Sequence, residues 1–106
     1  MAEEKRTIEI KAPCCSSIRE CHVRTKYVIS LEDEKIVKAI DAVRCYRGEE
    51  REYTIETNKP IAIIEYYRSN RGVHYLDVEY SDWDKERTLE IARRALGLET
   101  EEKIIV

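Results

Sequence analysis

Two apolar runs separated by a short polar turn constrain this chain more than any other feature of its sequence. The first run begins with four consecutive apolar residues, Ile61 to Ile64, and the second, from Tyr75 to Tyr80, alternates apolar and charged side chains. Between them lies the turn 69–72, with the sequence SNRG, whose Asn and Gly tolerate the positive φ of a tight connection. The pattern predicts a long β-hairpin whose first strand is covered on both faces and whose second strand is buried on one face.

In the second strand of this hairpin, Leu76, Val78 and Tyr80 alternate with Asp77 and Glu79. Successive side chains of a strand face opposite ways, so the three apolar residues are expected to point together toward the core. A register shift of one residue would bury the two carboxylates. The pattern therefore predicts a well-fixed register.

Three further strands and two helices are predicted outside the hairpin. Alternating apolar residues predict strands at about 7–11, 22–29 and 53–57. Apolar residues at three- and four-residue spacings predict one helix between Ser30 and Gly48 and a second between Ser81 and Gly97. The sheet-facing stripe of the first helix would contain Ile36, Val37, Ile40 and Val43.

The resulting order is strand, strand, helix, three strands and helix, which predicts an α+β fold for a single domain over residues 1–106. Sequential antiparallel strands with helices on one face give two layers, an antiparallel sheet and two helices packed on one face of it. A chain of 106 residues suits one ordinary domain. The apolar residues 104–106, Ile-Ile-Val, need a place to be buried, either as a short added strand or against a partner.

The charge content of the chain indicates its environment. Charged residues make up 39% of the chain, Gln is absent and Asn occurs only at positions 58 and 70, a composition typical of thermophile proteins. The net charge of −3 gives no broad attraction for nucleic acid, although a local basic face is possible. Neither a membrane-spanning stretch nor a signal region is recognisable, so we expect a cytoplasmic protein without a membrane partner.

Four cysteines, Cys14, Cys15, Cys21 and Cys45, form the first candidate site. Structural zinc sites use two sets of closely spaced ligands, a pattern that these cysteines lack, so we expect no metal. Disulfides are one expected state, because intracellular proteins of hyperthermophiles contain them, and Cys21 or a neighbour would then pair with Cys45. Buried free thiols are the alternative.

The histidines give little support for catalysis. Cys21 and His22 are adjacent in a predicted strand, so their side chains would diverge instead of forming a nucleophile–base pair. His74 is expected to be a partly buried histidine with its hydrogen bonds satisfied. A carboxylate pair, a glycine-rich phosphate loop and a Ser/His/Asp pattern are all missing from the sequence, so no catalytic residue and no cofactor is expected.

A second candidate site combines basic and aromatic side chains. Arg24 and Lys26 project from a predicted strand, while Tyr66, Arg68 and Arg71 lie near the tip of the hairpin. Basic residues beside aromatic residues on a sheet can bind phosphates and stack on bases. The alternative is a solvated surface in which the cations form ion pairs with the hairpin carboxylates Glu65, Asp77 and Glu79.

One stretch also carries a family resemblance. The segment 42–57, AVRCYRGEEREYTIET, is followed by two predicted strands and a helix that ends ARRALGLE. This arrangement, over about 42–102, resembles the N-terminal α+β domain of helix-hairpin-helix DNA glycosylases. The residues that match the family's arginine-rich helix and leucine-glycine-leucine-acid junction are Arg93, Arg94, Leu96, Gly97, Leu98 and Glu99. The helix-hairpin-helix and catalytic aspartate of that family have no counterpart here, so the resemblance implies a non-catalytic DNA-repair accessory module.

These observations favour a non-enzymatic interaction module that forms a homo-oligomer, through a sheet edge or through the tail Ile104–Val106. The alternative is a small nucleic-acid-binding or DNA-repair accessory protein that uses the basic and aromatic residues. A third hypothesis is a thiol-dependent enzyme built on Cys21 with His22 or His74.

Overall fold

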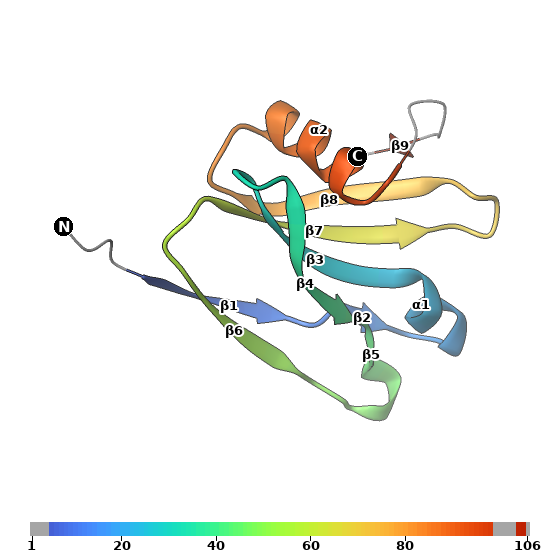
Figure 1. Ribbon diagram of the computed structural model, residues 1–106. Helices are drawn as coiled ribbons and strands as arrows, with labels where there is room; N and C mark the ends of the chain where they lie inside the picture. The colour runs from blue at the N-terminus through green and yellow to red at the C-terminus, as the bar shows by residue number, and fades with distance from the viewer. Residues whose placement is uncertain (1–4, 99–103, 106) are drawn as a thin grey trace.

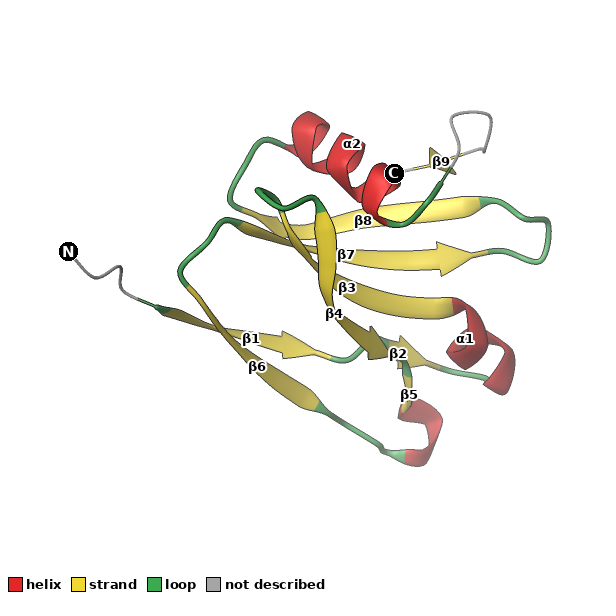
Figure 2. Ribbon diagram, viewed as in Figure 1, coloured by secondary structure: helices red, strands yellow, loops and turns green. Residues whose placement is uncertain are grey.

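The computed structural model describes residues 5–98 and 104–105. In chain order its elements are β1 (Arg6–Lys11), β2 (Cys14–Cys15), α1 (Ile18–Val23), β3 (Arg24–Ser30), β4 (Lys35–Asp41), β5 (Val43–Arg44), the short 3₁₀-helix η1 (Cys45–Arg47), β6 (Glu52–Thr57), β7 (Ile61–Arg68), β8 (His74–Ser81), α2 (Lys85–Ala95) and β9 (Ile104–Ile105). The expected α+β class is confirmed (Figures 1 and 2). Within the described ranges, neither α-helix is long and apolar enough to cross a membrane.

The predicted hairpin is β7 and β8, and it lies within a five-stranded sheet of order β4-β3-β7-β8-β9. Adjacent strands of this sheet are antiparallel, except that β9 runs parallel to β8. The turn closes with a hydrogen bond of 2.9 Å from the Ser69 amide to the Val73 carbonyl, and Gly72 adopts the positive φ that the sequence predicts. Ile61 to Ile64 are all at most 4% exposed, so both faces of β7 are covered as expected.

One face of the large sheet is covered by α2. The buried residues on this side are Ile29, Leu31, Ala62, Ile64, Leu76, Ile91 and Ala92. Figure 1 shows α2 lying over β8. We call this half of the molecule, with the sheet face that α2 covers, the helix side.

The opposite face is covered by a separate two-stranded antiparallel sheet made of β1 and β6. The buried residues here are Ile10, Val28, Ile40, Ile61 and Ile63, with Ile8, Tyr53 and Ile55 packed against them. We call this half the strand side. The expected arrangement of two layers with both helices on one face is therefore wrong. The 53–57 segment was expected in the same sheet as the hairpin, but it pairs with β1 to make a third layer.

The predicted helix between Ser30 and Gly48 is absent; its place is taken by β4, β5 and η1. Ile36, Val37 and Ile40 are β-branched, and such side chains favour strands over helices. Val37 is an extra residue at a β-bulge, since Ile36 pairs with Ile29 whereas Lys38 pairs with Val28. The bulge places Ile36 against the helix-side core and Ile40 in the strand-side core. The four-residue spacing of these two buried residues therefore resembles a helix although the segment is a strand.

The hydrogen bonds expected of Ser30 as a helix cap are present, but they stabilise a turn and not a helix. The Ser30 hydroxyl accepts a hydrogen bond from the Asp33 amide at 3.3 Å and lies 3.1 Å from the Asp33 carboxylate. Glu34 then takes a positive φ of 52°, and the chain reverses from β3 into β4. Gly48 ends the single turn of η1, not a long helix, and its amide donates to the Cys45 carbonyl at 2.9 Å.

A second bulge corrects the predicted facing of the β8 side chains. Ile64 pairs with Val78, but Ile63 pairs with Tyr80, so Glu79 is the extra residue. Tyr80 therefore shares the strand side with Ile63 instead of pointing with Leu76. The ladder thus tolerates one irregularity that the alternating sequence did not indicate.

The second predicted helix is confirmed as α2, with Asp84 as its N-cap instead of Ser81 or Asp82. Its end forms the predicted Schellman motif. The Leu98 amide donates to the Arg93 carbonyl at 2.9 Å, and the Gly97 amide donates to the Arg94 carbonyl at 3.2 Å. Leu98 then packs against the helix-side core.

The apolar end of the sequence was expected to form an added strand or a docking segment. Ile104 and Ile105 form β9, which pairs with His74 and Tyr75 at the edge of the large sheet. Val106 lies outside the described residues, as does Glu99 of the glycosylase-like junction.

Candidate functional site

The five residues of the predicted nucleic-acid site are dispersed. Arg24 and Lys26 are on β3, which is an interior strand and not an exposed one, and their side chains lie on the strand side. Tyr66 packs against the helix-side core, on the other face of the sheet. Arg68 and Arg71 are exposed at the tip of the hairpin. The structure therefore brings Arg24 and Lys26 near each other but separates Tyr66 from them.

Lys26 links the two sheets of the strand side. Its side chain is only 8% exposed. The ammonium group donates a hydrogen bond of 2.6 Å to the Lys11 carbonyl at the end of β1 and forms an ion pair of 2.9 Å with Glu79. Binding a ligand through Lys26 would break its contacts with the Lys11 carbonyl and Glu79, and breaking the contacts of a buried charge costs free energy.

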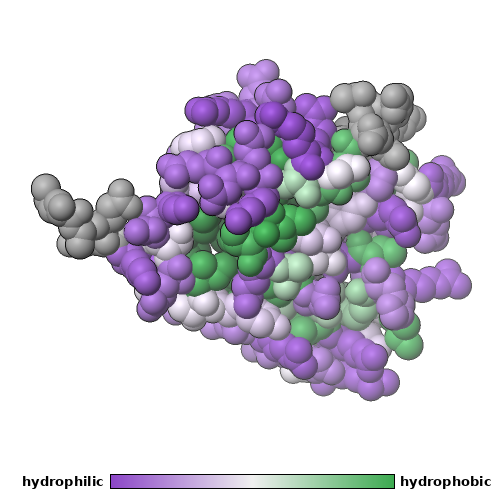
Figure 3. Space-filling model, viewed as in Figure 1, coloured by the Kyte–Doolittle hydropathy of each residue, from purple (hydrophilic) through white to green (hydrophobic). Residues whose placement is uncertain are grey.

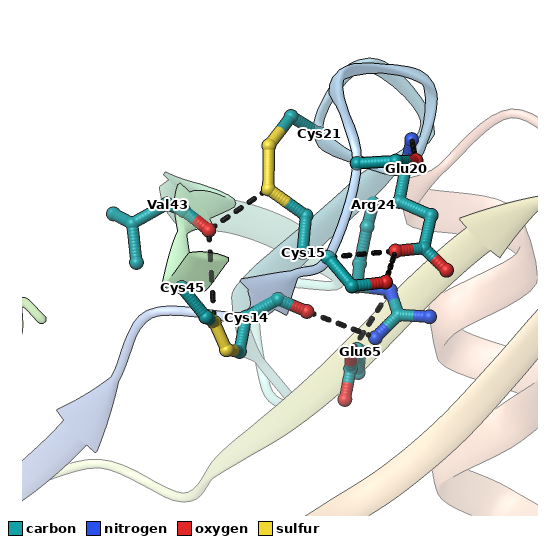
Figure 4. The surroundings of a disulfide bond; sticks show 10 residues. Cys14, Cys15, Glu20, Cys21, Arg24, Val43, Cys45 and Glu65 are labelled. Carbon is teal, nitrogen blue, oxygen red and sulfur yellow. Dashed lines mark hydrogen bonds and ion pairs between the residues drawn. A yellow bond between two sulfur atoms is a disulfide. The ribbon is translucent and has the colours of Figure 1, made fainter. Parts of the chain in front are cut away.

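Arg24 is also engaged inside the molecule. Its guanidinium donates to the Cys14 carbonyl at 3.2 Å and lies 3.7 Å from the Glu65 carboxylate (Figure 4). It also stacks 5.3 Å from the ring centre of Tyr67. Burial raises the pKa of Glu65, and Arg24 opposes that rise. Arg24 and Lys26 thus form ion pairs with the hairpin carboxylates Glu65 and Glu79, as the alternative predicted, but Lys26 is buried and does not lie on a solvated surface.

The histidines do not meet the cysteines in a catalytic arrangement. His74 is half-buried; its ring stacks on Tyr66 and its Nδ1 is hydrogen-bonded to the Tyr66 hydroxyl, as expected for a satisfied histidine. His22 belongs to α1 and not to a strand, and it is exposed. Its neighbour Cys21 faces Cys15 at disulfide distance.

All four cysteines gather at one end of the strand side, in two disulfide pairs. Cys14 pairs with Cys45 and Cys15 pairs with Cys21, with Cα–Cα distances of 5.4 and 5.2 Å that suit disulfides. Cys45 is therefore in a disulfide as expected, but its partner is Cys14 and not Cys21. Within residues 5–98 and 104–105, no group of three or more His, Cys, Asp or Glu side chains is placed to hold a metal ion.

The pairing depends on α1, which the sequence analysis did not predict. Ser17 is the N-cap of this helix, and the Glu20 carboxylate accepts a hydrogen bond of 2.7 Å from the Ser16 amide. The hydrogen bonds from Ser16 lower the pKa of Glu20. Ser-x-x-Glu at 17–20 is a capping-box signature that would have identified this helix. One turn of helix after Ser17 brings Cys21 back toward Cys15, because the chain doubles over in six residues.

The second pair depends on a parallel contact between β2 and β5. In the strand register, Cys14 lies opposite Val43 and Cys15 lies opposite Arg44. The Val43 amide donates a hydrogen bond of 2.9 Å to the Pro13 carbonyl. The two disulfides therefore lie on either side of the Val43 carbonyl (Figure 4). Its oxygen is 2.9 Å from the Cys15 sulfur and 3.9 Å from the Cys45 sulfur. Such contacts between distant segments leave no local sequence signal.

Two cavities border the cysteines. One, of about 160 Å³, is lined by Cys14 and Cys45 together with Lys11 and the residues 49–52. The other, of about 530 Å³, is lined by Cys21, His22 and a set of charged residues, Asp41, Arg44, Glu49 and Arg51. Both cavities share Val43, Glu49 and Arg51, so the segment after η1 forms part of both walls.

A third cavity, of about 460 Å³, is a groove between β4 and β6. We call it the lysine groove, because Lys35, Lys38 and Lys59 line it together with Val37, Ile55 and Ile61 and with the polar residues Ser30, Asp33, Thr54, Glu56 and Thr57. Val37 is 51% exposed. Figure 3 shows hydrophobic side chains reaching the surface along β4, bordered by hydrophilic ones. The sequence did not indicate this groove, because residues 35–40 have a helix-like apolar spacing.

Arg6 and Asp82 form a two-point charge contact on the strand side. The Arg6 guanidinium forks onto the Asp82 carboxylate at 2.7 and 2.9 Å and also donates to the Tyr80 hydroxyl at 2.8 Å. Asp82 additionally accepts the Ile61 amide at 2.9 Å. The Arg6 guanidinium holds the pKa of Asp82 well below its usual range. This contact ties the start of β1 to the end of β8.

Comparison with protein-family models, with curated proteins and with solved structures found no match for this chain. The glycosylase resemblance therefore stays a prediction, and any function rests on the geometry described above.

Proposed function

We propose that this protein is a non-enzymatic interaction module that self-associates, with the lysine groove of one copy receiving residues 99–106 of a second copy. The observation that carries the proposal is the groove itself. It has about 460 Å³ of space, within the range of ligand sites, and it combines three lysines with exposed apolar surface at Val37. An exposed site of this composition suits a segment that is both acidic and apolar.

Residues 99–106 have that composition, since they read Glu-Thr-Glu-Glu-Lys-Ile-Ile-Val. Three carboxylates precede three apolar residues. The groove carries a net positive charge, since its three lysines Lys35, Lys38 and Lys59 outnumber the two carboxylates Asp33 and Glu56. The apolar side chains Val37, Ile55 and Ile61 lie beside them. Lys59 lies 3.6 Å from Asp33, a pair that is about half exposed on both sides and therefore weakly held.

The geometry favours a second copy over the chain's own tail. β9 and β4 are at opposite edges of the five-stranded sheet, so Ile104 and Ile105 lie far from the groove of their own chain. The described part of β9 contains two residues, Ile104 and Ile105, and so short an edge strand is held by few ladder hydrogen bonds. Its release for binding in a neighbouring molecule would cost little.

Direct pairing of two β4 edges is less favourable. The bulge at Val37 and the flanking Lys35 and Lys38 are the features by which proteins prevent edge-to-edge pairing. The groove beside the edge, in contrast, stays open to a single segment. Of the two routes to self-association that the sequence suggested, the tail is therefore the one we propose.

Size-exclusion chromatography with light scattering tests this proposal through charge reversal. We expect the full chain to self-associate, and we expect both K35E/K38E and E99K/E101K/E102K to be monomers. Combining all five substitutions should restore association, because the complementary charges are then exchanged. K85E, on α2 away from the groove, is the matched control and should behave as the unmodified chain. A monomeric full chain at high concentration, or reversal variants that still associate, contradicts the proposal.

The same samples distinguish the nucleic-acid-binding alternative. That function predicts retention of labelled single- or double-stranded nucleic acid at low salt, with affinity that falls steeply as salt is added. Arg68 and Arg71 are its remaining exposed candidates. Retention that is lost in R68E/R71E, from a protein that stays monomeric, would favour the alternative over self-association.

A further inference from the structure

The two disulfides differ in their access to solvent. Cys14 is exposed and Cys45 is half-buried, whereas Cys15 is 0% exposed and its partner Cys21 is half-buried. The cavity of about 160 Å³ opens directly beside Cys14 and Cys45. Exposed disulfides exchange with external thiols, whereas inaccessible ones are structural. Cys14 is thus the one exposed cysteine of the four, although Cys21 also borders a cavity, and we expect an external thiolate to reach the Cys14–Cys45 bond first.

We propose that Cys14–Cys45 is a reversible thiol–disulfide exchange site for small dithiols and disulfides, and that Cys15–Cys21 is its structural support. An incoming thiolate attacks the exposed sulfur of Cys14, forms a mixed disulfide with it and displaces Cys45 as a thiolate. The second thiol of the dithiol then attacks the mixed disulfide and releases Cys14. The dithiol leaves as a cyclic disulfide, and two electrons and two protons have passed to the cysteine pair.

One contact of Cys45 suits it as the leaving group. Once protonated, the Cys45 thiol has an acceptor nearby, since its sulfur is 3.9 Å from the Val43 carbonyl oxygen. The reduced state therefore keeps a polar partner for the group that the reaction releases.

Reversibility follows from the backbone around the pair. Cys14 is held opposite Val43 by the β2–β5 ladder, and the Val43 and Ala12 amides donate to the Pro13 and Arg51 carbonyls, each at 2.9 Å. The Cys15–Cys21 bond additionally fixes β2 to α1. These contacts do not depend on the Cys14–Cys45 bond, so the two thiols remain neighbours after reduction. Reoxidation is then intramolecular, with the high effective concentration that this implies.

Timed reduction with dithiothreitol, quenched by alkylation and read by peptide mass spectrometry, tests the proposal on the full chain. We expect Cys14 and Cys45 to be alkylated at least tenfold faster than Cys15 and Cys21, while the far-UV circular dichroism stays unchanged. Transfer to oxidised glutathione should restore the Cys14–Cys45 disulfide, with release of two glutathione thiols and without alkylation of the other pair. Alkylation of all four cysteines together, earlier reduction of Cys15–Cys21, or loss of the fold on the first reduction each overturns the proposal.

Two variants separate the roles of the pairs. C15A/C21A removes the support but keeps the exchanging bond; it should still be reduced at Cys14–Cys45 yet reoxidise several-fold more slowly. C14A/C45A should show no fast alkylation at all, with Cys15–Cys21 still protected. Fast alkylation of C14A/C45A, or equal reoxidation of C15A/C21A, contradicts the assignment. The oligomeric state does not enter these measurements, so they are independent of the proposed self-association.

Discussion

The helix side and the strand side of the central sheet bury similar residues but are stabilised differently. The helix side is a continuous apolar cluster in which α2 covers the sheet with Ile91, Ala92 and flanking residues. The strand side has a smaller apolar cluster and depends on cross-links, namely two disulfides, the ion pair of buried Lys26 with exposed Glu79, and the Arg6–Asp82 contact. The three cavities described above all lie along the strand side or at its end.

The difference shows how a small domain can combine a stable core with accessible surface. A two-stranded sheet of β1 and β6 buries too little apolar area to hold itself in place. Covalent and ionic links at its two ends supply that attachment and leave space between β4 and β6. The grooves, and with them both proposed sites, are therefore expected on the cross-linked half of the molecule.

The sharpest comparison uses two adjacent residues of β7 that face opposite sides. Ile64 is 0% exposed in the helix-side cluster, and Ile63 is 4% exposed in the strand-side cluster. We expect I64A to lower the free energy of unfolding by about 4 kcal/mol and I63A by about 3 kcal/mol, since the larger cluster leaves the larger unfilled cavity. Urea denaturation of the two variants measures both values. A larger loss for I63A would reverse the proposed ranking of the two sides.

Removing each disulfide compares the cross-links with each other. Cys14–Cys45 spans 31 residues and Cys15–Cys21 spans 6. Chain entropy predicts that C14A/C45A loses about 3.5 kcal/mol and C15A/C21A about 2 kcal/mol. Thermal unfolding of both variants under oxidising conditions checks the order. Equal losses would mean that native-state contacts, and not loop closure, determine the contribution of these bonds.

The Arg6–Asp82 contact predicts a pH dependence on the strand side. The pKa of Asp82 is lowered in the folded state relative to an unfolded value near 3.9, so its contribution to stability is complete above about pH 4. It is lost as the pH falls further, because the unfolded chain takes up the proton first. D82N should therefore unfold a few degrees below the unmodified chain at neutral pH, and the gap should close between pH 4 and pH 2. D33N, at the exposed Asp33–Lys59 pair, is the control and should show little of this change.

The smallest effect is expected at the open edge. Val37 is 51% exposed at the β4 bulge, whereas Ile40 on the same strand is 1% exposed. V37T should change the free energy of unfolding by less than about 0.5 kcal/mol, while I40T should cost several times more because it buries a hydroxyl. Denaturant titration of the pair measures the contrast. A large loss in V37T would show that the lysine groove is part of the core after all.

Regions with strong local signals were predicted well. The β7–β8 hairpin, the turn at Gly72, β6 and the Schellman end of α2 at Gly97 all follow from alternation or from residues that tolerate special backbone angles. The errors arose where two local signals competed. In residues 30–48, a capping signal and a helix-like spacing favour a helix, whereas the β-branched residues favour a strand. The segment forms a strand with a bulge.

The candidate sites were predicted less well, for a physical reason. All four cysteines and the basic residues were identified as candidates, but pairing Cys14 with Cys45 needs the β2–β5 contact, and the engagement of Lys26 needs the β1 layer behind it. The lysine groove exists only because β4 and β6, from different sheets, run past each other with space between them.

By itself, the sequence determined that this chain forms an α+β domain around a long hairpin, because alternation and turn chemistry act over a few neighbouring residues. Only the tertiary structure decided which face each bulged strand presents, which cysteines pair and where the grooves lie. These properties depend on contacts between segments that are remote in the chain, and a local pattern cannot encode the energy of a contact whose partner it does not contain.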